Sequence, residues 1–212
     1  MRNGKLKEIY RRLFAVFGPQ HWWPGETAFE VSVGAILTQN TNWGNVERAI
    51  GNLRNEGLLD AEHLYRLPVG QLADLIRPAG YFNIKAKRLK NFVEFLAVNY
   101  GGRIRTMKRE EASAIRDKLL SVSGIGPETA DSIILYALGK PVFVIDAYTK
   151  RVLSRHSVLE HASSYADFQQ LFHSSLKRNA VMYNEFHALF VRLGKEHCRT
   201  QPICEGCPLE GM

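Results

Sequence analysis

The chain has 212 residues, of which 45% are hydrophobic and 23% are charged. These proportions are ordinary for a globular protein, and the length suffices for one large domain or two small ones. Lysine and arginine outnumber aspartate and glutamate by 28 to 21, which leaves a net charge of +7. This balance favours a polyanionic partner, because Lys and Arg contacts to phosphate release condensed counterions.

The sequence carries no sign of export or of membrane insertion. Its first segment, MRNGKLKEIYRRLF, has no apolar signal core, and no later run approaches the length of a membrane-spanning helix. We therefore expect an intracellular protein with no membrane partner. All three cysteines follow residue 197, which excludes a disulfide framework as the basis of the fold.

Helical periodicity runs along almost the whole chain. Segment 28–37 (AFEVSVGAIL) is apolar on nearly every side and predicts a buried central helix. Apolar residues at helical spacing in 46–53, 89–96 and 168–176 predict amphipathic helices. The apolar run 142–145 could be extended, but it has no obvious partner strand. The sequence therefore predicts an all-α fold.

Residues 111–130 predict two helices joined by a short glycine hairpin. EASAIRDKLLSV (111–122) forms the first helix, and Pro127 suits the first position of the second. Gly124 and Gly126 lie between them without side chains, so their N–H groups can approach a phosphate at a helix N-terminus. Alternatively, both glycines serve only the geometry of a tight turn.

An acidic residue ends the apolar run that follows the hairpin. Asp146 precedes a segment whose Tyr148, Val152 and Leu153 have helical spacing. The simplest role for Asp146 is therefore a helix N-cap. A catalytic role is compatible with capping, because the amide N–H groups and the helix dipole favour a carboxylate at this point.

Residues 119–152, LLSVSGIGPETADSIILYALGKPVFVIDAYTKRV, resemble the helix-hairpin-helix and catalytic-aspartate segment of the endonuclease III superfamily of DNA glycosylases. Three further motifs match in the family's order. In ILTQNT (36–41), Gln39 occupies the place of a glutamine that wedges into DNA, and GYFNIKAKRL (80–89) is similar to a turn followed by a basic helix, which here contains Lys85. CRTQPICEGCPL (198–209) is similar to the family's iron–sulfur loop. The resemblance thus covers most of the chain.

The resemblance implies two helical domains with a DNA-binding cleft between them. A six-helix barrel is expected over 25–136, with the helix-hairpin-helix at 111–138. The second domain combines 1–24 with 137–212 and ends in a cysteine loop at 198–207. The resemblance also implies a monomer that binds double-stranded DNA containing damaged bases. Such a protein is expected in the cytoplasm of a bacterium or archaeon, associated with the nucleoid.

The resemblance assigns the chemistry to Asp146, which stabilises an oxocarbenium-like sugar or prepares a water after the target nucleotide is flipped out. Relatives that also cut the strand use a hairpin lysine as the nucleophile. Glu128 occupies that position here. A carboxylate cannot form an imine, so a monofunctional glycosylase without AP-lyase activity is expected. Glu128 can equally be a first-turn acid favoured by the helix dipole. Gln39, Gly124, Gly126 and Lys85 are the expected DNA-binding residues.

Two tryptophan-containing motifs suggest the substrate. HWWPG (21–25) and NTNWG together hold all three tryptophans of the chain. With the hairpin glutamate, they resemble the endonuclease III-like bacterial 3-methyladenine DNA glycosylases. The match places Trp22, Trp23, Pro24, Trp43 and Glu128 around the base. Aromatic rings suit a positively charged alkylated base through stacking and cation–π attraction, although tryptophans are often simply part of a core.

The cysteine spacing is close to that of the family's iron–sulfur loop but departs from it. Cys198, Cys204 and Cys207 give C-x5-C-x2-C, whereas the family has six residues in the first gap and a fourth cysteine that five intervening residues separate from the third. That fourth ligand would directly follow Met212. We expect a structural [4Fe–4S] cluster. A zinc site that recruits His197 is the second choice, and unliganded cysteines are the third.

Three functions therefore remain open. The first is a monofunctional base-excision-repair glycosylase that hydrolyses the N-glycosidic bond of alkylated purines such as 3-methyladenine. The second is a glycosylase of the endonuclease III type that acts on oxidised pyrimidines or mismatches. The third is a non-catalytic helix-hairpin-helix DNA-binding protein, which the presence of Asp146 disfavours.

Overall fold

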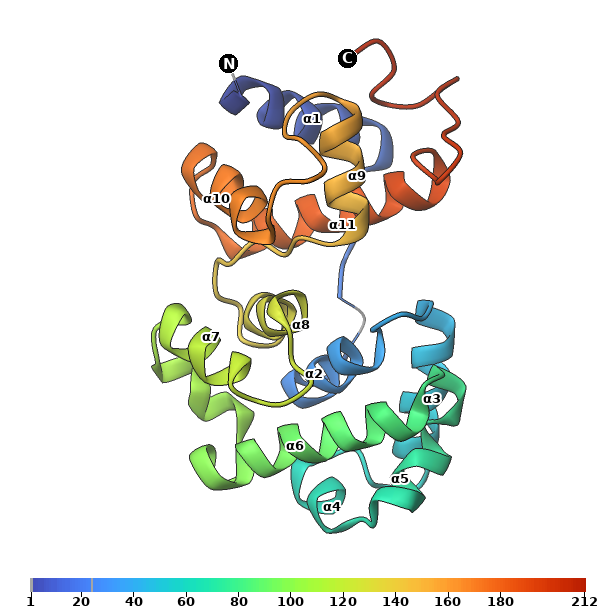
Figure 1. The fold of residues 1–212 in the computed structure, drawn as a ribbon, viewed down its shortest axis with the longest axis vertical. Coiled ribbons are helices and arrows are strands. Elements are labelled where there is room, and N and C mark those ends of the chain that lie inside the picture. Colours follow the sequence, from blue (N-terminus) through green and yellow to red (C-terminus); the bar gives the residue numbers. More distant parts are fainter. Residues whose placement is uncertain (1, 24) are drawn as a thin grey trace. The chain divides into compact units, whose positions relative to one another are not determined.

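A computed structural model of the chain describes residues 2–23 and 25–212. Pro24, predicted to line the base pocket, lies outside the described residues. The regular elements, in chain order, are α1 (Arg2–Phe17), α2 (Ala28–Leu37), α3 (Trp43–Asn55), α4 (Ala61–Arg66), α5 (Val69–Leu75), η1 (Arg77–Ala79), α6 (Phe82–Tyr100), η2 (Ile104–Arg109), α7 (Ala112–Leu120), α8 (Pro127–Ser132), η3 (Ile133–Ala137), α9 (Ala147–Arg155), α10 (Tyr165–Ser175) and α11 (Ala180–Glu196). Every regular element in these ranges is helical, which confirms the all-α prediction (Figure 1).

The chain divides into two compact units. Residues Pro24–Gly139 form the first, which we call the middle unit, and it contains α2 to η3. Met1–Trp23 and Lys140–Met212 form the second, which we call the terminal unit. In Figure 1 the blue helix α1 accordingly packs with the orange and red helices α10 and α11. None of the helices in 2–23 and 25–212 is long and apolar enough to span a membrane.

Helix α2 is the core of the middle unit. Every residue from Phe29 to Leu37 is buried, as the uniformly apolar sequence predicts. The helix starts at a Thr27 cap, whose side chain accepts a hydrogen bond from the Glu30 N–H at 3.1 Å. It packs against α3, α6, α8 and the π-helical turn η3. The hairpin therefore continues directly into an element that is packed on the central helix.

An ion pair between a half-buried arginine and a buried aspartate joins the two helices of the hairpin. Asp131 on α8 is fully buried, and Arg116 on α7 donates to both of its carboxylate oxygens, at 2.7 and 3.2 Å. The pairing is bidentate, which fixes orientation as well as distance. On α7, Ile115 and Leu119 are buried, and both are close to Arg116 in the sequence. The angle between α7 and α8 is thus set by a charged contact together with apolar packing.

The terminal unit is built around α11. Nine of its residues are buried, from Tyr183 to Gly194. Helix α9 packs closely against it, because a side chain at Gly194 would overlap the ring of Tyr148. Phe143 stacks on Phe172 with ring centroids 3.6 Å apart. The extended run 142–145 is buried throughout, so this core fixes the segment that leads into Asp146.

Replacing Arg116 with methionine tests the role of the hairpin ion pair. Arg116→Met leaves the Asp131 carboxylate buried without its main cation, and we expect the free energy of unfolding to fall by about 3 kcal/mol. Urea denaturation monitored by circular dichroism measures this change. Arg105→Met, at an exposed position of η2, serves as the control and should change the unfolding free energy little. Equal stability of the two variants would contradict a structural role for the pair.

Candidate active site

Asp146 caps α9 and is held there by the backbone. Its Oδ1 accepts a hydrogen bond from the Thr149 N–H at 2.7 Å, which confirms the predicted N-cap. The positive end of the helix dipole lies at the same point. The Asp146 side chain is 12% exposed, so the carboxylate is recessed but still reaches the surface. The geometry offers a fixed, negatively charged oxygen pair at a helix N-terminus.

A buried histidine faces the other oxygen of this carboxylate. His187 on α11 is 5% exposed, and its Nε2 lies 3.6 Å from Asp146 Oδ2. Burial lowers the pKa of His187 below its ordinary value, while the Asp146 carboxylate acts in the opposite direction. No sequence motif indicates a role for His187. Nothing local marks it, since it is one polar residue on a long amphipathic helix that begins after residue 179.

The hairpin presents bare backbone to its surroundings. Gly124 has φ of +93°, which a residue with a side chain rarely adopts, and Gly126 precedes Pro127 at the start of α8. Both glycines are exposed, whereas Ile125 between them is 5% exposed and anchors the loop. Neither glycine N–H donates a hydrogen bond within the described part of the chain. These groups are therefore available to an external acceptor.

Arg88 crosses the hairpin at Gly124 and contacts Gln39. A Cβ at Gly124 would overlap Arg88 Cγ and lie 2.9 Å from its Cδ. The Arg88 guanidinium donates to Gln39 Oε1. Gln39 Nε2 in turn donates to Thr129 Oγ1 at 2.8 Å and to the Gly124 carbonyl at 3.3 Å. Gln39, predicted to wedge into DNA, is thus tied to the loop of the hairpin and to its second helix, α8.

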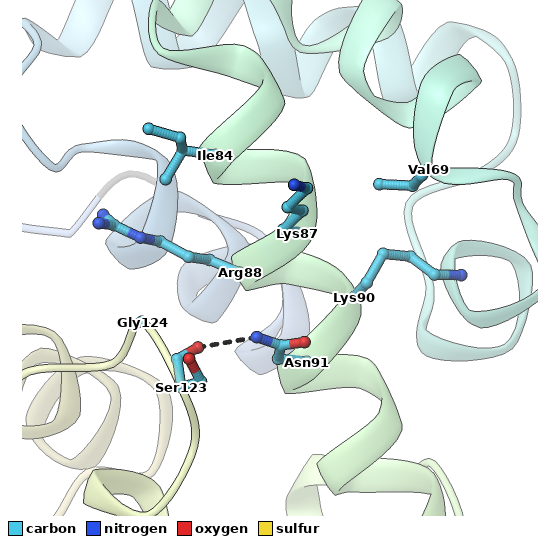
Figure 2. A pocket seen from close by; sticks show the side chains of 8 residues that line it. All are labelled: Val69, Ile84, Lys87, Arg88, Lys90, Asn91, Ser123 and Gly124. Atoms are coloured by element: carbon cyan, nitrogen blue, oxygen red, sulfur yellow. Dashed lines mark hydrogen bonds between the residues drawn. The ribbon is translucent and has the colours of Figure 1, made fainter.

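A basic cavity of about 660 Å³ adjoins the same hairpin. Figure 2 shows its lining: Val69, Ile84, Lys87, Arg88, Lys90, Asn91, Ser123 and Gly124. Asn91 closes one side by donating from Nδ2 to the Ser123 carbonyl at 3.0 Å. Lys90 is engaged with backbone carbonyls at the end of α4, including that of Leu67 at 3.0 Å. Lys87 is the exposed lysine of this lining.

The assignment of Lys85 to DNA binding is wrong. Its side chain is 1% exposed, and its Nζ donates to the Ala79 carbonyl at 2.7 Å, at the end of η1. Burial lowers the pKa of Lys85 to about 8. The motif KAKR (85–88) is basic, but the register of α6 turns Lys85 inward with Ala86 and Leu89. Lys87 and Arg88 are the basic residues of this motif that line the cavity.

The predicted base-contacting residues are distributed over both units. Trp22 and Trp23 of the terminal unit are half-buried, with ring centroids 5.5 Å apart at an interplanar angle of 75°. Lys195 Nζ lies 5.9 Å from the centroid of the Trp22 ring. In the middle unit, Trp43 is half-buried at the first position of α3, and Glu128 is exposed in the first turn of α8.

The three cysteines line one cavity of about 430 Å³ in the terminal unit. Burial, supported by the neighbouring Cys198 and Cys204 thiols, raises the pKa of Cys207. Among the described residues, no three His, Cys, Asp or Glu side chains are grouped so that they could hold one metal ion. A tetrahedral zinc site needs such a group, with Zn–S distances of about 2.3 Å. The residues therefore do not fit zinc as arranged.

An iron–sulfur cluster makes a different demand on the same thiols. Each thiolate binds a different iron of a [4Fe–4S] cluster, so its ligands lie farther apart than those of a single ion. Cys198, Cys204 and Cys207 line the same cavity of the terminal unit. In the structure, Cys198 Sγ accepts a hydrogen bond from Arg155 Nη1 at 3.3 Å. The sequence supplies no fourth cysteine.

Comparison with known proteins identifies the family to which the chain belongs. Residues 33–178 match the family model of the HhH-GPD superfamily of base excision DNA repair proteins. The chain belongs to this family, and its class of activity is that of a DNA glycosylase. MJ1434 of Methanocaldococcus jannaschii, which bears a provisional name as a DNA repair glycosylase, is 47% identical over 99% of this chain and 97% of its own.

Other relatives span several activities within the superfamily. Endonuclease III of Sulfolobus acidocaldarius is 26% identical over 84% of this chain and 78% of its own. The Helicobacter pylori 3-methyladenine DNA glycosylase MagIII, solved with 1,N6-ethenoadenine, has a TM-score of 0.78 and 28% identity, covering 92% of this chain and 97% of its own. An endonuclease III–DNA complex shares the fold with a TM-score of 0.84 at 21% identity, covering 98% of this chain and 92% of its own.

The two hairpin glycines predict different responses to alanine. Gly124→Ala places a side chain in left-handed backbone and against Arg88, so the free energy of unfolding should fall by at least about 1–2 kcal/mol. Gly126→Ala meets open space, with no atom within 4 Å of the new Cβ, and should change stability by less than about 0.5 kcal/mol. Thermal or urea unfolding measures both. A Gly126→Ala variant as unstable as Gly124→Ala would show that the hairpin geometry is misassigned.

Proposed function

We propose that the protein is a monofunctional DNA glycosylase that hydrolyses the N-glycosidic bond of alkylated purines such as 3-methyladenine. The observation that carries this proposal is the Asp146 carboxylate, which the Thr149 N–H holds at the N-terminus of α9. A DNA glycosylase needs a carboxylate to stabilise the cationic sugar that forms when the base leaves. Glu128, in place of a lysine, favours hydrolysis over strand cleavage.

Asp146 acts on the sugar. When the bond between C1′ and the base nitrogen breaks, its electron pair leaves with the base, and the sugar becomes an oxocarbenium-like cation. The Asp146 carboxylate stabilises that cation more strongly than it stabilises the neutral ground state, which is the requirement for catalysis. A water then adds to C1′, and Asp146 accepts the proton that the water loses. The products are the free base and an abasic site.

Because Glu128 stands where relatives have a nucleophilic lysine, water is the nucleophile in the proposed reaction. A glycosylase that cuts the strand attacks C1′ with an amine and forms a Schiff base. Glu128 is exposed in the first turn of α8, where the family's lysine would stand, and its carboxylate cannot form an imine. Lys140 and Lys150 are elsewhere in the sequence and do not occupy this position. The reaction therefore ends at the abasic site.

The tryptophans support a cationic, planar substrate. Trp22, Trp23 and Trp43 are each half-buried, so part of each ring remains accessible. A base alkylated on N3 or N7 carries positive charge, stacks on aromatic rings and is attracted to their faces. It is also a good leaving group, so catalysis needs little acid. The MagIII protein, which is named a 3-methyladenine DNA glycosylase and is solved with the modified adenine 1,N6-ethenoadenine, supports a modified purine as the substrate but not its positive charge.

The middle unit supplies the contacts to the DNA backbone in this proposal, and acts as the family's six-helix barrel domain. The N–H groups of Gly124 and Gly126, which donate to no acceptor in 2–23 or 25–212, bind phosphate oxygens. Lys87 and Arg88 add positive charge at the adjoining cavity (Figure 2). Gln39 fills the space of the flipped nucleotide, for which it has to leave its bonds to Thr129 and Arg88.

The cysteine cavity is proposed to hold a [4Fe–4S] cluster with a structural role. Cys198, Cys204 and Cys207 would be its protein ligands, and a bound cluster would supply cross-links between segments of the terminal unit rather than a catalytic step. No step of base excision depends on it.

Substituting Asp146 tests the proposed chemistry. Asp146→Asn keeps a side chain that can cap α9 but removes the charge, so base release from methylated DNA should fall by at least about 100-fold while DNA binding is retained. High-performance liquid chromatography of released bases and a fluorescence binding assay measure the two quantities. Wild-type protein should also give no borohydride-trapped adduct. Undiminished release by Asp146→Asn, or strong trapping by the wild type, would contradict the proposal.

Replacing neighbouring lysines of α6 tests the DNA contact. Lys87→Ala should weaken binding to damaged and undamaged DNA alike and reduce the slope of log K against log salt by about 1. The control Lys7→Ala removes the same charge from an exposed position of α1 and should leave that slope unchanged. Lys85→Met should destabilise the fold without changing the slope. Identical slopes for Lys87→Ala and the wild type would remove Lys87 from the interface.

A further inference from the structure

The two oxygens of the Asp146 carboxylate have different partners. Oδ1 accepts the Thr149 N–H at 2.7 Å, and this bond alone leaves the carboxylate free to tilt about it. Oδ2 lies 3.6 Å from Nε2 of His187, which comes from α11 and not from the capped helix. A carboxylate oxygen has two acceptor positions, so contact with a histidine does not exhaust Oδ2. Two separate elements therefore bracket one functional group.

The surroundings of His187 restrict both its orientation and its charge. The side chain is 5% exposed, and its ring meets that of Phe143 edge to face, with centroids 6.4 Å apart. Burial lowers the pKa of His187, although the nearby carboxylate opposes the shift. A neutral imidazole can donate one N–H without bringing a positive charge to Asp146. A lysine or arginine at this point would form an ion pair and weaken the attraction between Asp146 and a cationic sugar.

We propose that His187 is a positioning residue for base excision, and that its neutral imidazole donates from Nε2 to Asp146 Oδ2 and thereby fixes the plane of the carboxylate. This inference rests on the proposed role of Asp146. The distance of 3.6 Å is slightly longer than a hydrogen bond. Hydrogen bonds within catalytic groups commonly tighten when the substrate binds, so the proposal requires this distance to shorten in the complex with damaged DNA. His187 touches no reacting atom in this arrangement.

Two variants of His187 separate positioning from packing. His187→Leu removes the donor but fills the space with apolar atoms, so the fold should persist. We expect its single-turnover rate of base release to fall by about 10- to 100-fold, because small displacements of a catalytic group have effects of this size. DNA affinity should stay at the wild-type value. His187→Gln returns an N–H donor near the position of Nε2 and should restore most of the rate.

Tyr183→Phe provides the matched control. Tyr183 is fully buried, lies one turn earlier on α11 and also meets Phe143 edge to face, so this change removes a polar group from the same core. Its excision rate should equal that of the wild type. Thermal unfolding of all three variants identifies any loss of rate that arises from partial unfolding.

The outcomes separate this inference from the proposed function. Release of methylated purines by the wild type tests the substrate assignment. The ratio of variant to wild-type rates tests His187, on whichever damaged DNA the wild type acts upon. Wild-type rates in His187→Leu would overturn the inference. Equal losses in His187→Leu and His187→Gln would also overturn it, because they would show that the ring is needed for packing and not as a donor.

Discussion

The hydrogen bond from the Thr149 N–H to Asp146 is the contact on which the account depends. It fixes a carboxylate at the start of α9 at 2.7 Å, and the rest of the terminal unit holds that point still. The buried run 142–145 leads directly into Asp146 and anchors the start of α9. Gly194 has no side chain, so Tyr148 of α9 can pack directly against α11. A capping interaction that is common in helical proteins thus places a functional group.

The hairpin depends on a comparable constraint in the middle unit. Gly124 has no side chain, and for this reason Arg88 can cross it and reach Gln39. The ion pair between Arg116 and Asp131 holds the two helices on either side. The backbone N–H groups that face outward are consequently presented by a rigid support. In the proposed function this support matters, because phosphate contacts set the register of a protein on DNA.

The sequence predicts correctly those features that depend on interactions between residues close together in the chain. The buried helix at 28–37, the start of α8 at Pro127 and the cap at Asp146 all follow from patterns within a few residues. The errors and omissions concern contacts that are distant in sequence. The basic motif predicts that Lys85 binds DNA, whereas packing onto the end of η1 turns its side chain inward. His187 meets Asp146 only through the packing of α9 on α11, which no short motif encodes.

The most direct test of the account is the identity of the base that the wild-type protein releases. Duplex DNA containing both methylated purines and oxidised pyrimidines is incubated with the full chain, and the released bases are identified by mass spectrometry while strand cleavage is followed on the same sample. The account predicts free 3-methyladenine and an intact strand with an abasic site. Release of oxidised pyrimidines together with strand cleavage would contradict it.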